Sequence, residues 1–177
     1  MYDGYKKYGK EEASSYEEER EKEDHWWQED QYVADYFRSN QPSEILDAPV
    51  GTGRFFHHYI NAEKIIGIDI SEQMLAESTK KLLNQHLKNI SLQHADILKL
   101  DFLDNQFDLT ICWRFAHLVP EELLGSALLE LGRVTKGTIL LQAYVAPPYW
   151  VRLLLALARL PNKLIRPLTG SSPPPPP

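Results

Sequence analysis

The sequence predicts one α/β domain built on a doubly wound, mostly parallel sheet of about five strands with helices on both faces. Two observations support this fold class. Short apolar, β-branched segments alternate along the chain with segments of helical periodicity, and the short connections suit the crossover units of a parallel sheet. The chain has 177 residues, 43% of them hydrophobic, which is enough to bury one core of ordinary size.

The alternation begins with a helix, a strand and a glycine-bearing loop. Apolar side chains recur at roughly helical spacing over residues 26–37 and stop before Pro42, which predicts a helix leading into the core. Residues 44–48 predict a first strand that enters the loop 49–53, and residues 54–60 predict a helix after that loop. The glycine-bearing loop therefore connects the first strand to a helix.

Two further strand and helix units follow the loop. Residues 64–70 include four isoleucines and predict a buried second strand. Ser71 is a suitable N-cap for a helix that ends near residue 85. Residues 90–94 and 107–113 predict the third and fourth strands, both in the interior of the sheet.

The fifth strand comes after one more helix. Pro120 stands at a first-turn position and opens a helix through residue 131. Gly137 then precedes a strand predicted over residues 138–144. Beyond this strand, residues 149–160 predict a short helix, and the proline-rich last eight residues predict unstructured sequence.

Charge is unevenly distributed and divides the chain into three parts. The formal net charge of -6 resides in residues 1–30, which hold eleven acidic and five basic residues, whereas every charged residue after Glu130 is basic. Residues 1–24 have few aliphatic side chains and predict a flexible acidic arm or lid. Residues 25–146 form the predicted ligand-binding domain, and residues 147–177 form a basic, apolar tail with a disordered end.

Composition also bears on location and partners. The single cysteine excludes an internal disulfide, and the first thirty residues lack the apolar core of a signal peptide, so we expect a cytoplasmic protein. Arg152 and Arg159 interrupt the longest apolar stretch, which is too short to span a bilayer. That stretch could instead lie on a membrane surface or pack on the sheet. Nucleic acid is not an expected partner, because the core lacks a broad basic face.

The loop after the first strand is the most informative segment. Asp47 ends the strand, and Gly51 and Gly53 let the backbone turn sharply and approach a ligand without a clashing Cβ atom. The carboxylate of Asp47 is placed to accept hydrogen bonds from a ligand amine or hydroxyl. Similar loops hold dinucleotides, although their fingerprint requires a small residue where this chain has Phe56. The loop alone therefore leaves a nicotinamide or flavin site open.

Two more acids follow the next two strands. Asp69 stands at the end of the second strand, where a carboxylate is well placed to bind the two hydroxyls of a ribose. Asp96 lies just past the third strand and could accept a hydrogen bond from an adenine amino group. Each acid could instead cap a turn or helix. Their joint placement after three successive strands favours a nucleoside-containing ligand.

These segments resemble, in order, the class I S-adenosylmethionine-dependent methyltransferases. The quoted matches are Ile45-Leu-Asp-Ala-Pro-Val-Gly-Thr-Gly-Arg-Phe55, Ile66-Gly-Ile-Asp-Ile-Ser-Glu-Gln-Met-Leu75, Ala95-Asp96, Phe107-Asp-Leu-Thr-Ile-Cys-Trp-Arg-Phe-Ala-His-Leu118 and Glu130-Leu-Gly-Arg-Val134. The resemblance implies a Rossmann-like fold and S-adenosylmethionine as cofactor. It implies cofactor contacts at Asp47, Pro49, Gly51, Gly53, Arg54, Asp69, Ile70, Asp96, Ile97, Cys112 and Trp113.

Within that set, the resemblance places Asp47, Gly51 and Gly53 around the methionine part, Asp69 at the ribose, and Asp96 with Ile97 at the adenine. Two departures from the family stand out. Pro49 replaces a usual glycine, and no candidate strands follow residue 147, where the family sheet continues with two more. A naturally short form, a fragment of a longer protein and an altered end all fit this second departure.

The acceptor side of the site is less defined. His117 could act as a general base or sit as a half-buried turn residue, and Arg114 could bind an anionic substrate or pair with a surface acid. Tyr16 and Trp26, on or near the acidic arm, could close over the site. His57 and His58 are expected to be exposed or packing residues, and no metal site is predicted, because no cysteine cluster accompanies them.

The leading hypothesis is methyl transfer to a small-molecule acceptor through an oxygen, nitrogen or carbon nucleophile. A protein that binds S-adenosylmethionine without catalysis is the second hypothesis, since the C-terminal departure could remove substrate-recognition elements. A nicotinamide-dependent oxidoreductase is the third, and it predicts tighter binding of NAD than of S-adenosylhomocysteine. The sequence does not identify the acceptor or the oligomeric state.

Overall fold

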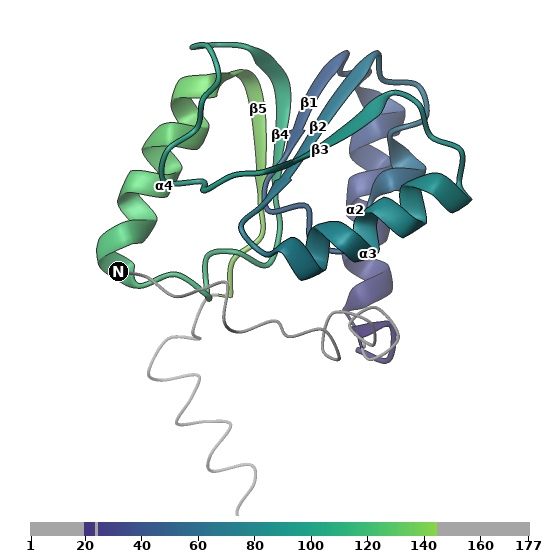
Figure 1. The fold of residues 1–177 in the computed structure, drawn as a ribbon, viewed down its shortest axis with the longest axis horizontal. Helices are drawn as coiled ribbons and strands as arrows, with labels where there is room; N and C mark the ends of the chain where they lie inside the picture. The colour runs from purple at the N-terminus through teal and green to yellow at the C-terminus, as the bar shows by residue number, and fades with distance from the viewer. Residues whose placement is uncertain (1–19, 24, 145–177) are drawn as a thin grey trace, which may run out of the picture. The chain divides into compact units, whose positions relative to one another are not determined.

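The computed structural model describes residues 20–23 and 25–144 (Figure 1). Its elements are α2 (Trp26–Ser39), β1 (Glu44–Asp47), η2 (Phe56–His58), β2 (Lys64–Asp69), α3 (Glu72–Asn84), β3 (Ile90–His94), β4 (Phe107–Cys112), α4 (Glu121–Val134) and β5 (Thr135–Leu141). In this part of the chain, no helix combines the length and apolarity needed to cross a membrane. The expected arm up to residue 19 and the expected tail helix lie outside the described residues.

The five strands form one parallel sheet in the order β3-β2-β1-β4-β5. The chain moves outward from β1 to β3, returns to the other side of β1, and continues outward to β5. The strand order therefore reverses between β1 and β4, and such a switch point is where open α/β sheets bind ligands, beyond the carboxyl ends of the strands. This confirms the predicted fold class.

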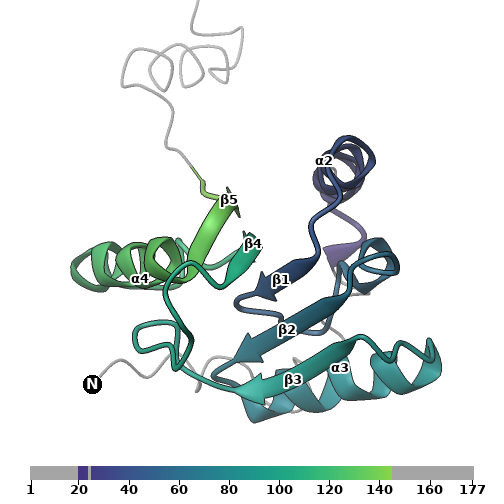
Figure 2. The ribbon, with the colours of Figure 1, turned by 90° about the horizontal axis from the view of Figure 1, so that it is seen from above.

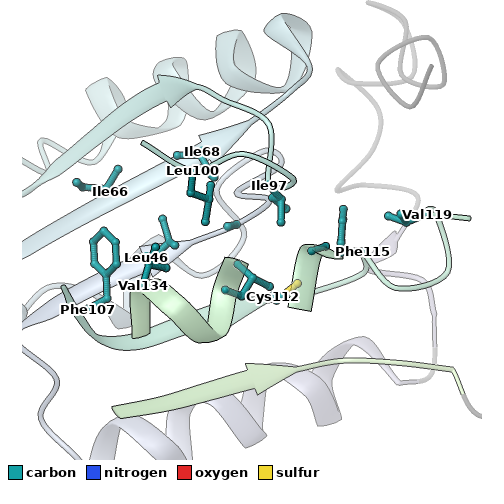
Figure 3. Packing of buried hydrophobic residues seen from close by; sticks show 13 residues of the cluster. Leu46, Ile66, Ile68, Ile97, Leu100, Phe107, Cys112, Phe115, Val119 and Val134 are labelled. Atoms are coloured by element: carbon teal, nitrogen blue, oxygen red, sulfur yellow. The ribbon is translucent and has the colours of Figure 1, made fainter. Parts of the chain in front are cut away.

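Helices cover both faces of the sheet, with α4 on one side and α2 and α3 on the other (Figure 2). Successive strand residues point to opposite faces. Leu46 and Ile66 accordingly belong to the cluster beneath α4, whereas Ile45 and Ile65 belong to the cluster on the opposite face. Figure 3 shows the first cluster, which includes Leu46, Ile66, Ile68, Ile97, Leu100, Phe107, Cys112, Phe115, Val119 and Val134.

Most predicted elements are confirmed close to their expected bounds. The first four strands begin at the expected residues. Ser71 caps α3 as expected, because its Oγ atom accepts a hydrogen bond from the backbone N–H of Met74 at 3.3 Å. Since α3 begins directly after β2, this cap also fixes how the chain leaves the ligand-binding end of that strand.

The helix predicted over residues 54–60 is wrong. The chain forms turns and the single 3₁₀ turn η2 there. A segment this short between a loop and β2 cannot gain from cooperative helix formation, and short 3₁₀ turns are the usual alternative. The side chains still bury Phe56 and Tyr59, so tertiary packing fixes the segment.

The position of β5 is also a correction. The strand covers Thr135–Leu141 and follows α4 directly, three residues earlier than predicted, so Gly137 lies inside it. A Cβ atom at position 137 would stand 2.0 Å from the backbone oxygen of Asp108, where the β4–β5 register shifts. The glycine therefore marks a close approach of two strands, and it does not precede the strand as we expected.

This close approach predicts opposite effects for two glycine substitutions. Gly137→Ala should lower the free energy of unfolding by at least about 2 kcal/mol, because the new methyl group collides with backbone of a central strand. Gly132→Ala, on the exposed side of α4 with open space around it, should raise that free energy by about 0.5–1 kcal/mol. Urea unfolding of both variants tests the pair, and equal stability of the two would contradict it.

Candidate functional site

A cavity lies at the carboxyl ends of the strands around the switch point. Most of the expected site residues line it, namely Asp47, Pro49, Gly51, Arg54, Asp69, Ile70, Asp96, Ile97, Trp113 and Arg114. The apolar cluster beneath α4 continues into its wall, because Ile97, Phe115 and Val119 belong to both (Figure 3). The cavity therefore combines a firmly packed wall with polar groups from successive strand ends.

Asp47 is a buried carboxylate at the end of β1. Its Oδ2 atom accepts a hydrogen bond of 2.7 Å from the hydroxyl of Tyr59. The pKa of Asp47 is raised to about 7: burial is the largest cause, the hydrogen bond from Tyr59 lowers the pKa, and the nearby carboxylate of Asp69 raises it. A positively charged ligand group would relieve both unfavourable effects, so the position suits an amine.

Asp69 connects the glycine-bearing loop to the start of α3. Its Oδ2 atom accepts the N–H of Gly51 at 3.0 Å, and its Oδ1 atom accepts the N–H of Ser71 at 2.8 Å. Burial raises the pKa of this carboxyl, and the backbone N–H groups partly offset that effect. Because both oxygens are fixed by backbone, the carboxylate is held in one orientation at the cavity wall.

The loop between these acids is shaped by its glycines. Gly51 and Gly53 have φ angles of 55° and 78°, in the region that favours glycine. A Cβ atom at Gly51 would meet nothing within 4 Å, whereas one at Gly53 would collide with the ring of Phe56. Gly51 therefore presents bare backbone to the cavity, and Gly53 serves the packing beneath the loop.

Asp96 and Ile97 follow β3 at the far side of the cavity. Asp96 is exposed, and its Oδ1 atom accepts the N–H of Leu98 at 2.9 Å. Ile97 is buried beside it. This arrangement offers an apolar surface for a flat ring next to a carboxylate at its edge.

Arg54 and Arg114 line the cavity near the start of α2, and each pairs with a glutamate. Arg54 donates to Glu29 at 2.6 Å and lies 3.5 Å from the centre of the Trp26 ring. Arg114 donates to Glu23 at 2.6 Å and also lies 3.5 Å from Glu29. These pairs hold the end of the acidic segment and the start of α2 against the cavity.

Several predicted residues do not line this cavity. Gly53 supports the loop, and Cys112 is buried in the cluster beneath α4, where burial raises its pKa to about 12. His117 is exposed, and its ring packs edge-on against Tyr144 with centroids 5.0 Å apart. Tyr16 lies outside the described residues, so its expected role stays a prediction.

Several apolar residues of the cavity wall were not predicted as site residues. They are Val50, Phe55, Met74, Ala95, Leu98, Leu118 and Val119. Nothing in the sequence indicated the pairing of Glu23 and Glu29 with arginines. One available signal was Trp26, a large apolar residue at the end of a charged segment, which is buried and lines the cavity. Which arginines pair with Glu23 and Glu29 depends on the fold, because the partners are distant in the chain.

A polar atom in the wall indicates a ligand. Trp113 lines the cavity, and its indole Nε1–H is buried without a hydrogen-bond partner among the residues that the structure describes. A buried donor normally finds an acceptor, so this one suits a polar group of a bound molecule. Together with the open backbone at Gly51, it fits a ligand that carries amine, hydroxyl and aromatic groups.

Residues 45–138, more than half of the chain, match the family described as methyltransferase domain. The demethylmenaquinone methyltransferase of Bacteroides fragilis is 35% identical over 101 residues, which cover 54% of this chain and 40% of the relative. The phosphatidylethanolamine N-methyltransferase of Cereibacter sphaeroides is 33% identical over 78 residues, 44% of this chain and 38% of the relative. The matched part thus spans about 40% of these curated relatives.

A solved structure shares the fold. Magnesium protoporphyrin IX methyltransferase from Synechocystis, with bound S-adenosylhomocysteine, superposes with a TM-score of 0.61 at 17% sequence identity. The similarity covers 76% of this chain and 62% of that protein. At this level of identity the likeness shows the fold alone.

Proposed function

The chain belongs to the methyltransferase domain family, whose cofactor is S-adenosylmethionine, and from this we propose that it transfers a methyl group to a small-molecule acceptor. The observation that carries the proposal is the placement of three carboxylates, those of Asp47, Asp69 and Asp96, after three successive parallel strands around one cavity. The glycine-bearing loop lies between the first two, as a ligand with an amine, a ribose and an adenine requires.

Each acid suits a different part of that cofactor. Asp47, with its raised pKa, would accept from the cationic amine, and Asp69 would accept from the ribose hydroxyls. Asp96 and Ile97 would hold the adenine. When bound, the cofactor supplies a methyl group on a sulfonium, which is already activated for displacement. The task of the chain is therefore to align the acceptor with it.

The acceptor side supports an anionic or lipophilic small molecule. Arg114 lines the cavity and contacts Glu23, Glu29 and the ring nitrogen of His25, and an acceptor anion could replace these contacts. The relatives act on demethylmenaquinone and phosphatidylethanolamine by name, and both are lipids. His117, exposed beside Tyr144, is kept as the candidate base, because an exposed imidazole can accept a proton near neutral pH.

Titration with S-adenosylhomocysteine tests the proposal without knowledge of the acceptor. We expect micromolar affinity by calorimetry, about -8 kcal/mol, and no comparable affinity for NAD in a parallel titration. Tighter binding of NAD would instead support an oxidoreductase. Binding of S-adenosylhomocysteine without turnover across quinone, amine and phospholipid acceptors would support a protein that binds the cofactor without catalysis.

A further inference from the structure

Two consecutive histidines meet an acid of α2 outside the residues that line the strand-end cavity. His57 and His58 lie on η2, and Asp30 lies one turn into α2. One atom from each of the three residues can be chosen so that all three atoms lie within 4.8 Å of one another. No pattern in the sequence indicates this cluster, because Asp30 is distant from the histidines in the chain and no cysteine accompanies them.

The distances suit a tetrahedral metal ion. The Nε2 atoms of His57 and His58 lie 3.3 and 3.1 Å from the same Oδ1 atom of Asp30. Bonds of 2.0–2.2 Å to zinc in tetrahedral geometry separate neighbouring ligand atoms by about 3.3 Å. An ion can therefore enter between these atoms with small side-chain adjustments.

The surroundings orient one imidazole and leave access for the ion. The ring of His58 stacks on that of Phe37, with centroids 6.2 Å apart and planes 18° apart, which fixes its orientation. His57 is about half exposed, and both histidines line a second cavity beside α2. That cavity leaves room for water as a fourth ligand.

Two arginines lie near this place, and each is paired with an acid, while burial and the charge of Arg54 both lower the pKa of His58. Arg38 lines the second cavity, but it pairs with Asp35 at 2.5 Å. Arg54, on the other side of η2, pairs with Glu29 at 2.6 Å. The carboxylate of Asp30 faces the two imidazoles, so its charge is available to an ion.

We propose that Asp30, His57 and His58 bind one divalent transition-metal ion of the zinc type. Two imidazoles and one carboxylate suit zinc, whereas calcium and magnesium favour sites built from oxygen ligands. The ion would join α2 to the segment that follows the glycine-bearing loop. Because Glu29, next to Asp30, holds Arg54 at the cofactor cavity, the metal would stabilise the helix that borders this cavity.

Zinc titration of the full chain, prepared without a histidine tag, tests the proposal. Calorimetry should give one ion per chain with a Kd of 10 μM or lower in order of magnitude, and zinc at 100 times Kd should raise Tm by at least about 5 °C. Magnesium should produce neither effect. No zinc binding below millimolar concentration would overturn the proposal.

Variants locate the ion. His57→Ala and Asp30→Asn should each weaken zinc binding at least tenfold, since each removes one ligand. The matched control is His86→Asn, which changes an exposed histidine outside the cluster and keeps a residue type that tolerates the φ of 55° at that position. Unchanged affinity in both cluster variants, or equal loss in the control, would show that zinc binds elsewhere and would overturn the proposal.

Discussion

At pH 8 the Asp47→Asn variant should unfold with a free energy on the order of 3 kcal/mol larger than that of the unmodified chain. Burial raises the pKa of Asp47 from 3.8 to about 7, so the folded state holds this proton more tightly than the unfolded state does. Its stabilisation is complete below pH 3.8 and is lost as the pH rises to about 7. Above that pH the native protein carries a buried charge near Asp69, and asparagine removes it.

Urea unfolding from pH 3 to pH 8 measures this effect. The difference between variant and unmodified chain should grow with pH and level off above pH 7. Asp108→Asn is the matched control with the opposite sign, because hydrogen bonds from the backbone of Glu44 and an ion pair with Lys136 lower the pKa of Asp108. That variant should lose stability at pH 8 and little at pH 3. A less stable Asp47→Asn at pH 8 would show that burial does not dominate.

The same variant should bind S-adenosylhomocysteine at least tenfold more weakly. A neutral amide replaces a charged acceptor for the ligand amine, and hydrogen bonds to charged groups contribute about 1.5–3 kcal/mol. Higher stability together with weaker binding would identify Asp47 as a residue kept for ligand binding at the expense of the fold. Unchanged affinity at pH 8 would place the amine elsewhere.

The sequence predicted the parts of the fold that local patterns determine. Apolar runs located the first four strands, and Ser71 located the start of α3, because buried strands and helix caps have short-range signatures. Gly137 misled the prediction of β5, since a glycine required by a close approach of strands looks like a turn glycine. The segment after Gly53 misled it as well, because packing of Phe56 overrides its helical pattern.

The candidate site divides in the same way. The three acids and the loop glycines could be predicted, because parallel strands place their carboxyl ends together at one edge of the sheet. The pairing of Arg54 and Arg114 with acids near the start of α2 could not, since many acids lie in that charged segment. The contact of Asp30 with His57 depends on how α2 packs over η2, which no local pattern determines.

Asp69→Ala should bind S-adenosylhomocysteine about 100-fold more weakly than the unmodified chain, the largest loss of affinity expected from a single change. The carboxylate holds the N–H groups of Gly51 and Ser71, so its removal deletes the acceptor for the ribose and also frees the loop. The two effects act on the same ligand, since Gly51 presents its backbone to the cavity. Calorimetry measures the affinity, and circular dichroism with Tm establishes that the variant is folded.

Asp96→Ala is the matched control for the loss of affinity in Asp69→Ala. Asp96 borders the same cavity but is exposed, and it holds one N–H group, that of Leu98, so its removal should weaken binding by no more than about tenfold. A larger loss for Asp69 than for Asp96 would follow from burial and loop control, because both variants lose one carboxylate. Equal losses of affinity would mean that only the charge of each carboxylate, and not its burial or its hold on the loop, contributes to binding. If a folded Asp69→Ala variant binds S-adenosylhomocysteine within threefold of the affinity of the unmodified chain, the ribose does not bind at the end of β2.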